Sequence, residues 1–209
     1  QPETAAIPVL QEPYHLSYPF LFEHEGTLYM IPEKTEVKRV DLYRCIEFPH
    51  RWEFVHTLID GIKIADSTLL EQDGKWWLLC AAKQGRTRIN ESLFVFSADS
   101  PLSQHWQAHP QNPVVRDLSA GRPAGRIFSL NGQLYRPSQD CVRRYGYGLN
   151  INQIKQLSHQ NYQESRCCHV DSAWQTGIRA NHHLDWHQGL MVMDAQRLIS
   201  RSLAGEIKS

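Results

Sequence analysis

Several side chains that could contact a ligand or carry a proton stand directly before strand-like apolar runs. Asp66 precedes STLL, Arg122 precedes PAGRIF, and the pair His182-His183 precedes LDW. Two further residues placed in this way, before the run PFLF, are His15 and Tyr18. These residue types offer a carboxylate, a guanidinium, imidazoles and a phenol, which can hydrogen-bond a ligand or exchange protons. They can act together only if the elements that follow them converge in space.

A repeat in the sequence predicts such convergence. Apolar runs turn at a polar-Gly pair and leave through an aromatic or apolar run, and the turn glycines are Gly26, Gly74, Gly132 and Gly189. They are spaced by 48, 58 and 57 residues, and Trp52 to Trp106 spans a similar 54 residues. β character with this period is typical of propeller blades, whose innermost strands line a central channel. The beginnings of the repeats should therefore meet at one mouth of that channel.

The pattern predicts an all-β fold, a β-propeller of four-stranded blades, with residues 15–209 as a single domain behind an N-terminal arm at 1–14. The expected blades cover about 15–61, 62–118, 119–172 and 173–209. Four units fit either a small ring or a five-bladed propeller whose first blade is missing or incomplete, and we favour the second. A sheet edge left open in this way would permit oligomerisation.

Composition narrows the class of protein. The chain has 209 residues, 41% of them hydrophobic, and its 22 Lys and Arg balance its 22 Asp and Glu. We therefore expect a soluble globular protein that binds no nucleic acid. No apolar stretch approaches the length of a membrane span, and the five cysteines lack CxxC spacing, so we expect free thiols and a cytoplasmic location. The chain begins at Gln1, as a piece of a longer protein would.

Specific motifs add a resemblance over about residues 8–194. HLSYPFLFEHEGTLYMIPE, DSTLLEQDGKWWL, GRPAGRIFSLNGQLYRPSQDC and YGYGLNI resemble a bacterial and plant domain family. Its members are found beside formyltransferase-like domains in polysaccharide-biosynthesis proteins and as the N-terminal part of plant glucosamine inositolphosphorylceramide transferase. The family is distantly similar to five-bladed propeller glycosidases of the family 43 type. The resemblance implies five blades and a carbohydrate ligand.

The resemblance also assigns roles at two positions. Asp66 matches the middle carboxylate of the glycosidases, which orients and tunes their general acid. Arg122 stands where they carry that acid, in GRP instead of an EGP-like motif, and the VADPF-like motif that holds their base has no counterpart. Arginine stays protonated and cannot donate the proton, but it can clamp a phosphate, a carboxylate or an anionic sugar. The structural alternatives are a turn-capping Asp66 and an Arg122 paired with a neighbouring acid.

Other candidates complete two alternative sites. Gln139 could hydrogen-bond sugar hydroxyls, and Arg126 shares a face with Arg122 if the strand between them is regular. Glu33 and Asp140 could supply the second carboxylate beside Asp66, although each could equally be a loop or strand-end acid. His183, Asp185 and His187 share a face, but a zinc site needs more convergent ligands, so we expect neither a metal nor another cofactor.

Two functions remain open. The first is a carbohydrate-recognition domain of glycan or polysaccharide biosynthesis, which binds a sugar, a nucleotide-sugar or a phosphorylated glycolipid in the central funnel for a fused or associated transferase. Its residues would be His15, Tyr18, Arg122, Arg126, Gln139, His182 and His183. The second is an enzyme derived from a glycosidase, a glycosyltransferase or hydrolase, with catalytic carboxylates among Asp66, Glu33 and Asp140.

Overall fold

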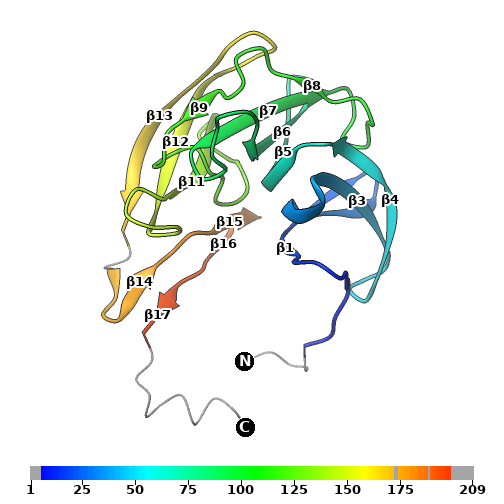
Figure 1. Ribbon diagram of the computed structural model, residues 1–209, viewed down its shortest axis with the longest axis horizontal. Coiled ribbons are helices and arrows are strands. Elements are labelled where there is room, and N and C mark those ends of the chain that lie inside the picture. Colours follow the sequence, from blue (N-terminus) through cyan, green and yellow to red (C-terminus); the bar gives the residue numbers. More distant parts are fainter. Residues whose placement is uncertain (1–5, 172–173, 188, 199–209) are drawn as a thin grey trace.

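Four groups of antiparallel strands follow one another around a centre in the computed structural model (Figure 1). The structure describes residues 6–171, 174–187 and 189–198. The part of the chain so described contains no α-helix, and a 3-10 turn at Thr35–Val37 lies between two strands. The fold is an all-β propeller, as the sequence predicts.

Three of the four groups are full blades. The first is β1 (Ser17–His24), β2 (Thr27–Glu33), β3 (Arg39–Glu47) and β4 (Arg51–Asp60). The second is β5 (Lys63–Gln72), β6 (Lys75–Lys83) and β7 (Ser92–Ala98), with the short β8 (Gln107–Ala108) and β9 (Val115–Arg116) both paired to β7. The third is β10 (Phe128–Leu130), β11 (Gln133–Asp140), β12 (Gly148–Leu157) and β13 (Tyr162–Val170).

The fourth group is smaller than the blade expected at 173–209. It consists of β14 (Ile178–Ala180) paired with β17 (Gln196–Arg197), and β15 (Leu184–His187) paired with β16 (Leu190–Met193). It is thus one two-stranded ribbon interrupted in the middle, among the residues that the structure describes. Residues 199–209 of the expected blade lie outside the described residues.

The repeat in the sequence corresponds to repeated local structure. Asp73 and Gly74 both have positive φ, 53° and 71°, and the pairs Glu25-Gly26 and Asn131-Gly132 have nearly the same values. Two successive residues with positive φ form the type I′ turn that suits the twist of a β-hairpin. The indoles of Trp52 and Trp106 each donate to the carbonyl three residues earlier, at 3.0 and 2.8 Å. The spaced glycines and tryptophans therefore mark equivalent positions in successive blades.

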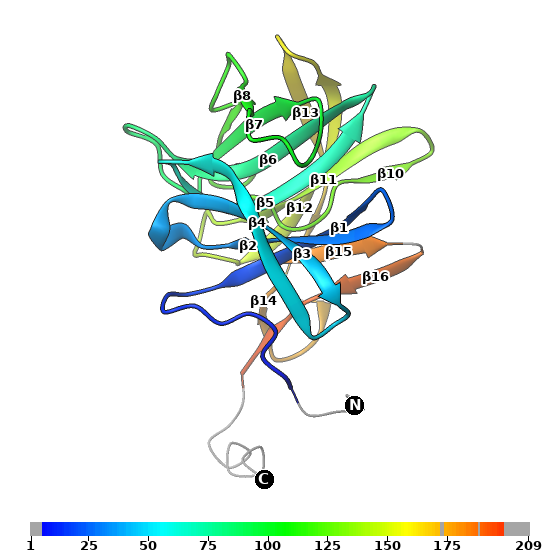
Figure 2. The ribbon, with the colours of Figure 1, turned by 90° about the vertical axis from the view of Figure 1, so that its right-hand side faces the viewer.

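The core lies between neighbouring blades, whose sheets are stacked one against the next (Figure 2). On β6, Leu78, Cys80 and Ala82 pack towards the first blade. Trp77 and Leu79 point the other way and pack against Ile127, Ile154 and Tyr162 of the third blade. This explains why the segment WWLLCAA is apolar throughout instead of alternating. A third cluster, around Leu149 and Leu184, joins the third and fourth groups.

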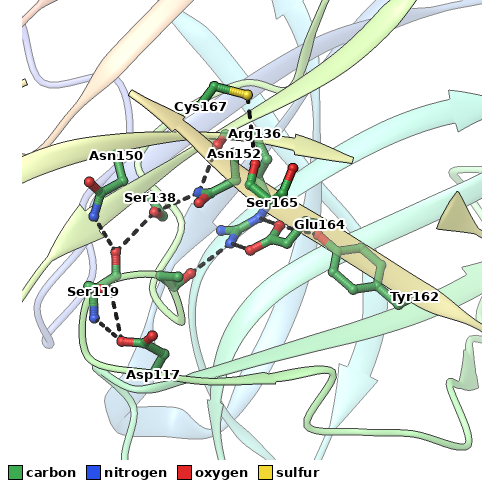
Figure 3. Close-up of polar contacts among 11 residues, drawn as sticks. Asp117, Ser119, Arg136, Ser138, Asn150, Asn152, Tyr162, Glu164, Ser165 and Cys167 are labelled. Atoms are coloured by element: carbon green, nitrogen blue, oxygen red, sulfur yellow. Dashed lines mark hydrogen bonds and ion pairs between the residues drawn. The ribbon is translucent and has the colours of Figure 1, made fainter. Parts of the chain in front are cut away.

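A buried polar network holds the loop before Arg122 on the third blade (Figure 3). Arg136 forms a bidentate ion pair with Glu164, at 2.8 and 2.6 Å, and donates to the carbonyl of Ala120 at 2.7 Å. Asn150 donates to the Ser119 carbonyl at 2.6 Å. Charge-assisted bidentate bonds fix geometry as well as charge, so the network sets the position from which Arg122 enters the channel.

Candidate functional site

A cavity of about 560 Å³ opens where the beginnings of the inner strands meet, and we call it the funnel. It contains eight of the ten residues that the sequence singles out. They are His15, Tyr18, Glu33, Asp66, Arg122, Gln139, His182 and His183. Ser17, Pro19 and Tyr145 complete its wall. Because these residues come from all four groups of strands, the cavity is a convergent site of the kind that binds small molecules.

Repeated bulges turn the side chains into the funnel. The register of β1 with β2 gains one extra residue between Ser17 and Phe20, and that of β5 with β6 gains one between Ala65 and Thr68. Tyr18 and Asp66 lie in these bulges with φ of 42° and 53°. Such values are unfavourable for side chains larger than glycine, and bulges and strained residues concentrate at functional sites. The two blades thus present Tyr18 and Asp66 from equivalent positions.

The fourth group repeats the bulge at His182 and His183. Ala180 pairs with Gln196 and Leu184 with Met193, so the inner strand has one residue more than its partner. Asp194 Oδ1 accepts both freed backbone amides, of His182 and of His183, at 2.9 Å each. The sequence could not reveal this role, since Asp194 follows the histidines by more than ten residues and carries no motif.

Arg122 is held by acceptors on three sides. Its Nε donates to Asp66 Oδ2 at 2.6 Å, its Nη1 donates to Asn90 Oδ1 at 2.7 Å, and its Nη2 lies 3.8 Å from Glu33 Oε2. The guanidinium also lies over the ring of Tyr145, 4.7 Å from its centre. Only 9% of Arg122 is exposed. Its charge is therefore balanced within the protein, and it is not the free anion clamp that the sequence suggested.

Asp66 can hold a proton close to neutral pH. Its residue is 3% exposed, and burial raises the pKa of its carboxyl to about 7, with Arg122 opposing the rise and the Glu33 carboxylate adding to it. Glu33 also accepts the backbone amide of Asp66 at 3.2 Å. Gln139 Nε2 lies 3.3 Å from Asp66 Oδ2 and donates to the Pro123 carbonyl at 3.1 Å. The two acids, the amide and the guanidinium form one connected floor.

The aromatic and imidazole groups stand around this floor. The Tyr18 hydroxyl is 2.9 Å from Thr68 Oγ1, and burial raises its pKa, so it stays a neutral phenol. The His183 ring meets the Tyr18 ring edge-on at 5.2 Å, and burial lowers the pKa of His183. His182 forms an ion pair with Asp194, whose hydrogen bond raises the pKa of the imidazole. The two adjacent histidines therefore favour opposite protonation states.

The structure places Arg126 outside the funnel. Its Nη2 donates to the Leu21 carbonyl at 2.6 Å, its Nε lies 3.3 Å from Asp185, and it stacks over Phe20. It lines a second cavity of about 750 Å³, farther along the inner strands, which shares only Pro19 with the funnel. The chain between Arg122 and Arg126 is not a strand, since β10 begins only at Phe128. Gly125 has φ of 136°, and a Cβ there would lie 1.8 Å from the Leu184 carbonyl oxygen. The expectation that Arg122 and Arg126 share a face therefore does not hold, because it required a regular strand between them.

Asp140 also lies outside the funnel. Its Oδ1 accepts the backbone amide of Val142 at 3.0 Å, and its Oδ2 is 3.9 Å from His169 Nδ1. This is the strand-end role that the sequence left as an alternative. The partner that Asp66 has in the funnel is Glu33. Sequence reasoning missed four residues that contact this site. Asn90, Tyr145 and Asp194 lie outside the strands, away from the beginnings of the inner strands, whereas Thr68 lies on β5, two residues after Asp66.

No group of three or more His, Cys, Asp or Glu residues in the described ranges is arranged to hold a metal ion, and His187 lines the second cavity while His183 lines the funnel. No helix there has the length and apolarity to cross a membrane.

Comparison with protein families matches residues 5–205 to the family described as glucosamine inositolphosphorylceramide transferase 1, N-terminal. The chain belongs to this family. It is 38% identical over 217 residues to glucosamine inositolphosphorylceramide transferase 1 of Oryza sativa subsp. japonica, and 35% identical over 159 residues to that of Arabidopsis thaliana. These matches cover 94% and 74% of the chain, but only 28% and 20% of the plant proteins. The family domain is thus about a quarter of those proteins.

Solved structures similar to this family domain include family 43 propeller glycosidases. A thermostable family-43 glycoside hydrolase superimposes with a TM-score of 0.60 at 14% identity, covering 88% of this chain and 64% of the hydrolase. An exo-beta-1,3-galactanase from Phanerochaete chrysosporium gives 0.58 at 12% identity, covering 88% and 44%. At such identities the likeness shows the fold, that of the five-bladed family 43 propellers, and no more.

Proposed function

We propose that this chain is a carbohydrate-recognition domain that serves a glycosyltransferase, with the sugar bound in the funnel. The family is named for a transferase of which the matched part is a fraction. The funnel has the size of a small-molecule site, and its groups can pair with hydroxyls as donors and as acceptors. Tyr145, 49% exposed, offers a ring face at the rim on which a pyranose can stack.

The observation that carries the proposal is the paired charge of Arg122. Asp66 and Asn90 accept hydrogen bonds from its Nε and Nη1, and the Glu33 carboxylate lies 3.8 Å from its Nη2, so the floor of the funnel carries little net charge. Such a floor suits the hydroxyl groups of a sugar better than a free phosphate, which would have to displace a buried carboxylate. Preorganised polar groups also bind without the cost of ordering flexible side chains.

The partner is a transferase domain, either in the same polypeptide or associated with it. In the plant relatives the matched region is joined to a much longer remainder. A bacterial partner of the formyltransferase-like type and a cytoplasmic location belong to the same proposal. In this arrangement the domain holds a glycan or its donor while the partner performs the transfer.

One observation favours an enzymatic alternative. Asp66 has its pKa raised to about 7, first by burial and then by Glu33, which is the property of a general acid near neutral pH. Glycosidases, however, place two carboxyls on either side of the scissile bond. Here both carboxylates converge on one guanidinium, so we rank this second, as a glycosyltransferase or hydrolase that uses Asp66 and Glu33.

The test is binding and turnover in the same samples. Wild-type protein is titrated calorimetrically with a panel of methyl glycosides and nucleotide-sugars, and free sugar is assayed after incubation. We expect saturable binding without sugar release, and at least about tenfold weaker binding for Tyr145→Ala, as for lost aromatic stacking. Phe54→Ala, which removes a ring 56% exposed on the outer strand of the first blade, is the matched control.

Three results would decide against the proposal. Sugar release by the wild-type protein that disappears in Asp66→Asn would show that the protein is an enzyme. Equal losses of sugar affinity in Tyr145→Ala and Phe54→Ala would show that the sugar does not bind in the funnel. Absence of any saturable binding to the panel would contradict carbohydrate recognition itself.

A further inference from the structure

The second cavity, of about 750 Å³, lies towards the hairpin turns of the blades. Later residues of three inner strands line it: 20–23 of β1, 69–71 of β5, and Asp185 and His187 of β15. The hairpins β1–β2 and β15–β16 point to the same side of the molecule (Figure 2). Since the cavity shares only Pro19 with the funnel, a molecule bound in it would not compete for the other funnel residues.

The wall of the second cavity combines aromatic rings with an excess of carboxylates. Among the described residues that line it, Glu23, Glu71 and Asp185 carry carboxylates, and Arg126 is the one with a guanidinium. Arg126 lies 3.3 Å from Asp185. Glu23 and Glu71 therefore give this wall a net negative charge, and an occupant of complementary chemistry is positively charged.

Arg126 shows how this wall holds a cation. Its guanidinium lies over the ring of Phe20, 4.4 Å from the ring centre, beside the Asp185 carboxylate. Ring and carboxylate thus hold one positive charge together. The same combination recurs where Glu71 of β5 pairs directly with Trp76 of β6, because directly opposed residues present their side chains on one face of the sheet. A second cation on an apolar stem can make the same two contacts there.

Exposed apolar side chains extend this surface beyond the cavity. Leu190 pairs with His187 and Val192 pairs with Asp185, so Leu190 and Val192 lie on the face of the ribbon that carries the two lining residues. They are 68% and 56% exposed, and Phe48 in the cavity wall is 69% exposed. Large exposed apolar residues beside a cavity are a feature of protein interaction surfaces. A segment of polypeptide can cover the cavity and its extension together, whereas a small cation would leave the extension exposed.

We propose that the second cavity and β16 dock an extended segment of a partner polypeptide in which Lys or Arg alternates with apolar residues. The cationic heads lie beside Glu23 and Glu71, and their stems lie along the rings of Phe48 and Trp76. The apolar residues between them cover Leu190. The proposal rests on the proposed function for the existence of a partner polypeptide, but it does not require that the funnel binds sugar.

Synthetic peptides of matched composition test the docking. Three short peptides, capped at both ends, alternate Leu with Lys, Leu with Glu, and Ser with Lys. Calorimetry measures their binding to the full chain, and NMR follows the tryptophan indole signals, with that of Trp76 assigned from Trp76→Phe. The test variant is Glu23→Gln/Glu71→Gln, at exposed positions of the cavity wall. The control is Glu53→Gln/Asp60→Asn, which removes two charges from exposed positions of β4 outside the cavity.

We expect the Leu-Lys peptide to bind at least about tenfold more tightly than the other two, because it alone has both the charge and the apolar side chains. Its binding should shift the Trp76 signal, weaken at least about tenfold in the test variant, and stay unchanged in the control. Equal affinity for the Leu-Lys and Leu-Glu peptides would overturn the proposal. Binding that survives in the test variant, or no saturable binding of the Leu-Lys peptide, would also overturn it.

Other occupants of the cavity would give different results. Butylamine that binds as tightly as the Leu-Lys peptide would assign the cavity to a small organic cation. A dimer in sedimentation equilibrium that the peptide dissociates would assign it to a second copy of this chain. A Trp76 signal that moves in Arg201→Gln/Lys208→Gln without peptide would assign it to residues 199–209. Each of these three results would overturn docking of a partner.

The methyl glycosides are titrated into the same samples to separate this proposal from the function of the funnel. Peptide binding without any glycoside binding would support the docking surface and contradict carbohydrate recognition. Glycoside binding without peptide binding would overturn the docking surface and leave carbohydrate recognition intact.

Discussion

Arg122 and Asp66, which are 56 residues apart, meet with Nε and Oδ2 separated by 2.6 Å at the floor of the funnel. Asp66 lies in the bulge of β5 and Arg122 in the loop before β10, so the pair joins the second blade to the third. The contact positions functional groups and at the same time holds two blades together. Substitutions here should therefore change stability as well as binding.

The first prediction concerns the charge of Arg122. Arg122→Leu leaves Asp66 and Glu33 buried without their counterion, and we expect the free energy of unfolding to fall by about 3–5 kcal/mol at pH 8. Urea unfolding followed by tryptophan fluorescence measures the loss. Arg51→Leu, at an exposed position on β4, should cost less than about 1 kcal/mol. A similar small loss for both variants would show that the ion pair does not stabilise the fold.

The second prediction is the pH dependence that Asp66 confers. In the folded protein burial raises the pKa of this carboxyl to about 7, whereas its ordinary value is 3.8. Between these values the folded state binds more protons than the unfolded state, so this group lowers stability as the pH rises through that window. Relative to wild type, Asp66→Asn should gain stability from pH 4 to pH 7 and no further above it. Unfolding free energies measured at several pH values test this, and a parallel profile for the two proteins would contradict it.

The third prediction separates the two adjacent histidines. Asp194 hydrogen-bonds His182 and raises its pKa, while burial lowers the pKa of His183. In Asp194→Asn the pKa of His182 should fall towards its ordinary value. NMR titration of the imidazole signals gives both pKa values in one experiment. The idea fails if His182 titrates at the same pH in wild type and variant.

The fourth prediction concerns the close approach of the third and fourth groups. An added Cβ at Gly125 would lie 1.8 Å from the Leu184 carbonyl oxygen, and the φ of 136° disfavours any side chain. Gly125→Ala should therefore cost more than about 2 kcal/mol of stability. At Gly132, also with positive φ but with nothing within 4 Å of the new Cβ, alanine should cost about 1 kcal/mol. Denaturant unfolding measures the loss of stability in each variant. Equal losses would show that the positive φ, and not the close approach to Leu184, makes Gly125 necessary.

Local features of the fold could be predicted from the sequence, and features that join distant segments could not. The turn at Asp73-Gly74 and the repeated Trp52 and Trp106 depend on neighbouring residues, so they are visible as motifs. The displacement of Arg126 depends on Gly125 passing close to Leu184 of another group, and no pattern within one strand shows this. The weak repeat around Gly189 gave no sign that the described fourth group would be a broken two-stranded ribbon.

The site follows the same division. The beginnings of the inner strands could be recognised, and eight of the predicted residues do line the funnel. The sequence could not show which of these residues would be free to bind a ligand. The partners of Arg122 include Asn90 from a loop in another blade and Glu33 from the far end of a hairpin. Asp194 supports His182 through backbone geometry, and its residue type alone carries no such signal.

Arg126 has a consequence for the shape of the molecules that the domain can accept. It reaches from the third blade to the Leu21 carbonyl of β1 and to Asp185 of β15, and Tyr18 reaches from β1 to Thr68 of β5. These cross-braces leave the funnel and the cavity beyond it with Pro19 alone in common. A glycan bound as proposed would therefore enter the funnel by one end and stop at these contacts, so the proposed function favours ligands with a free terminus over the middle of a long polymer.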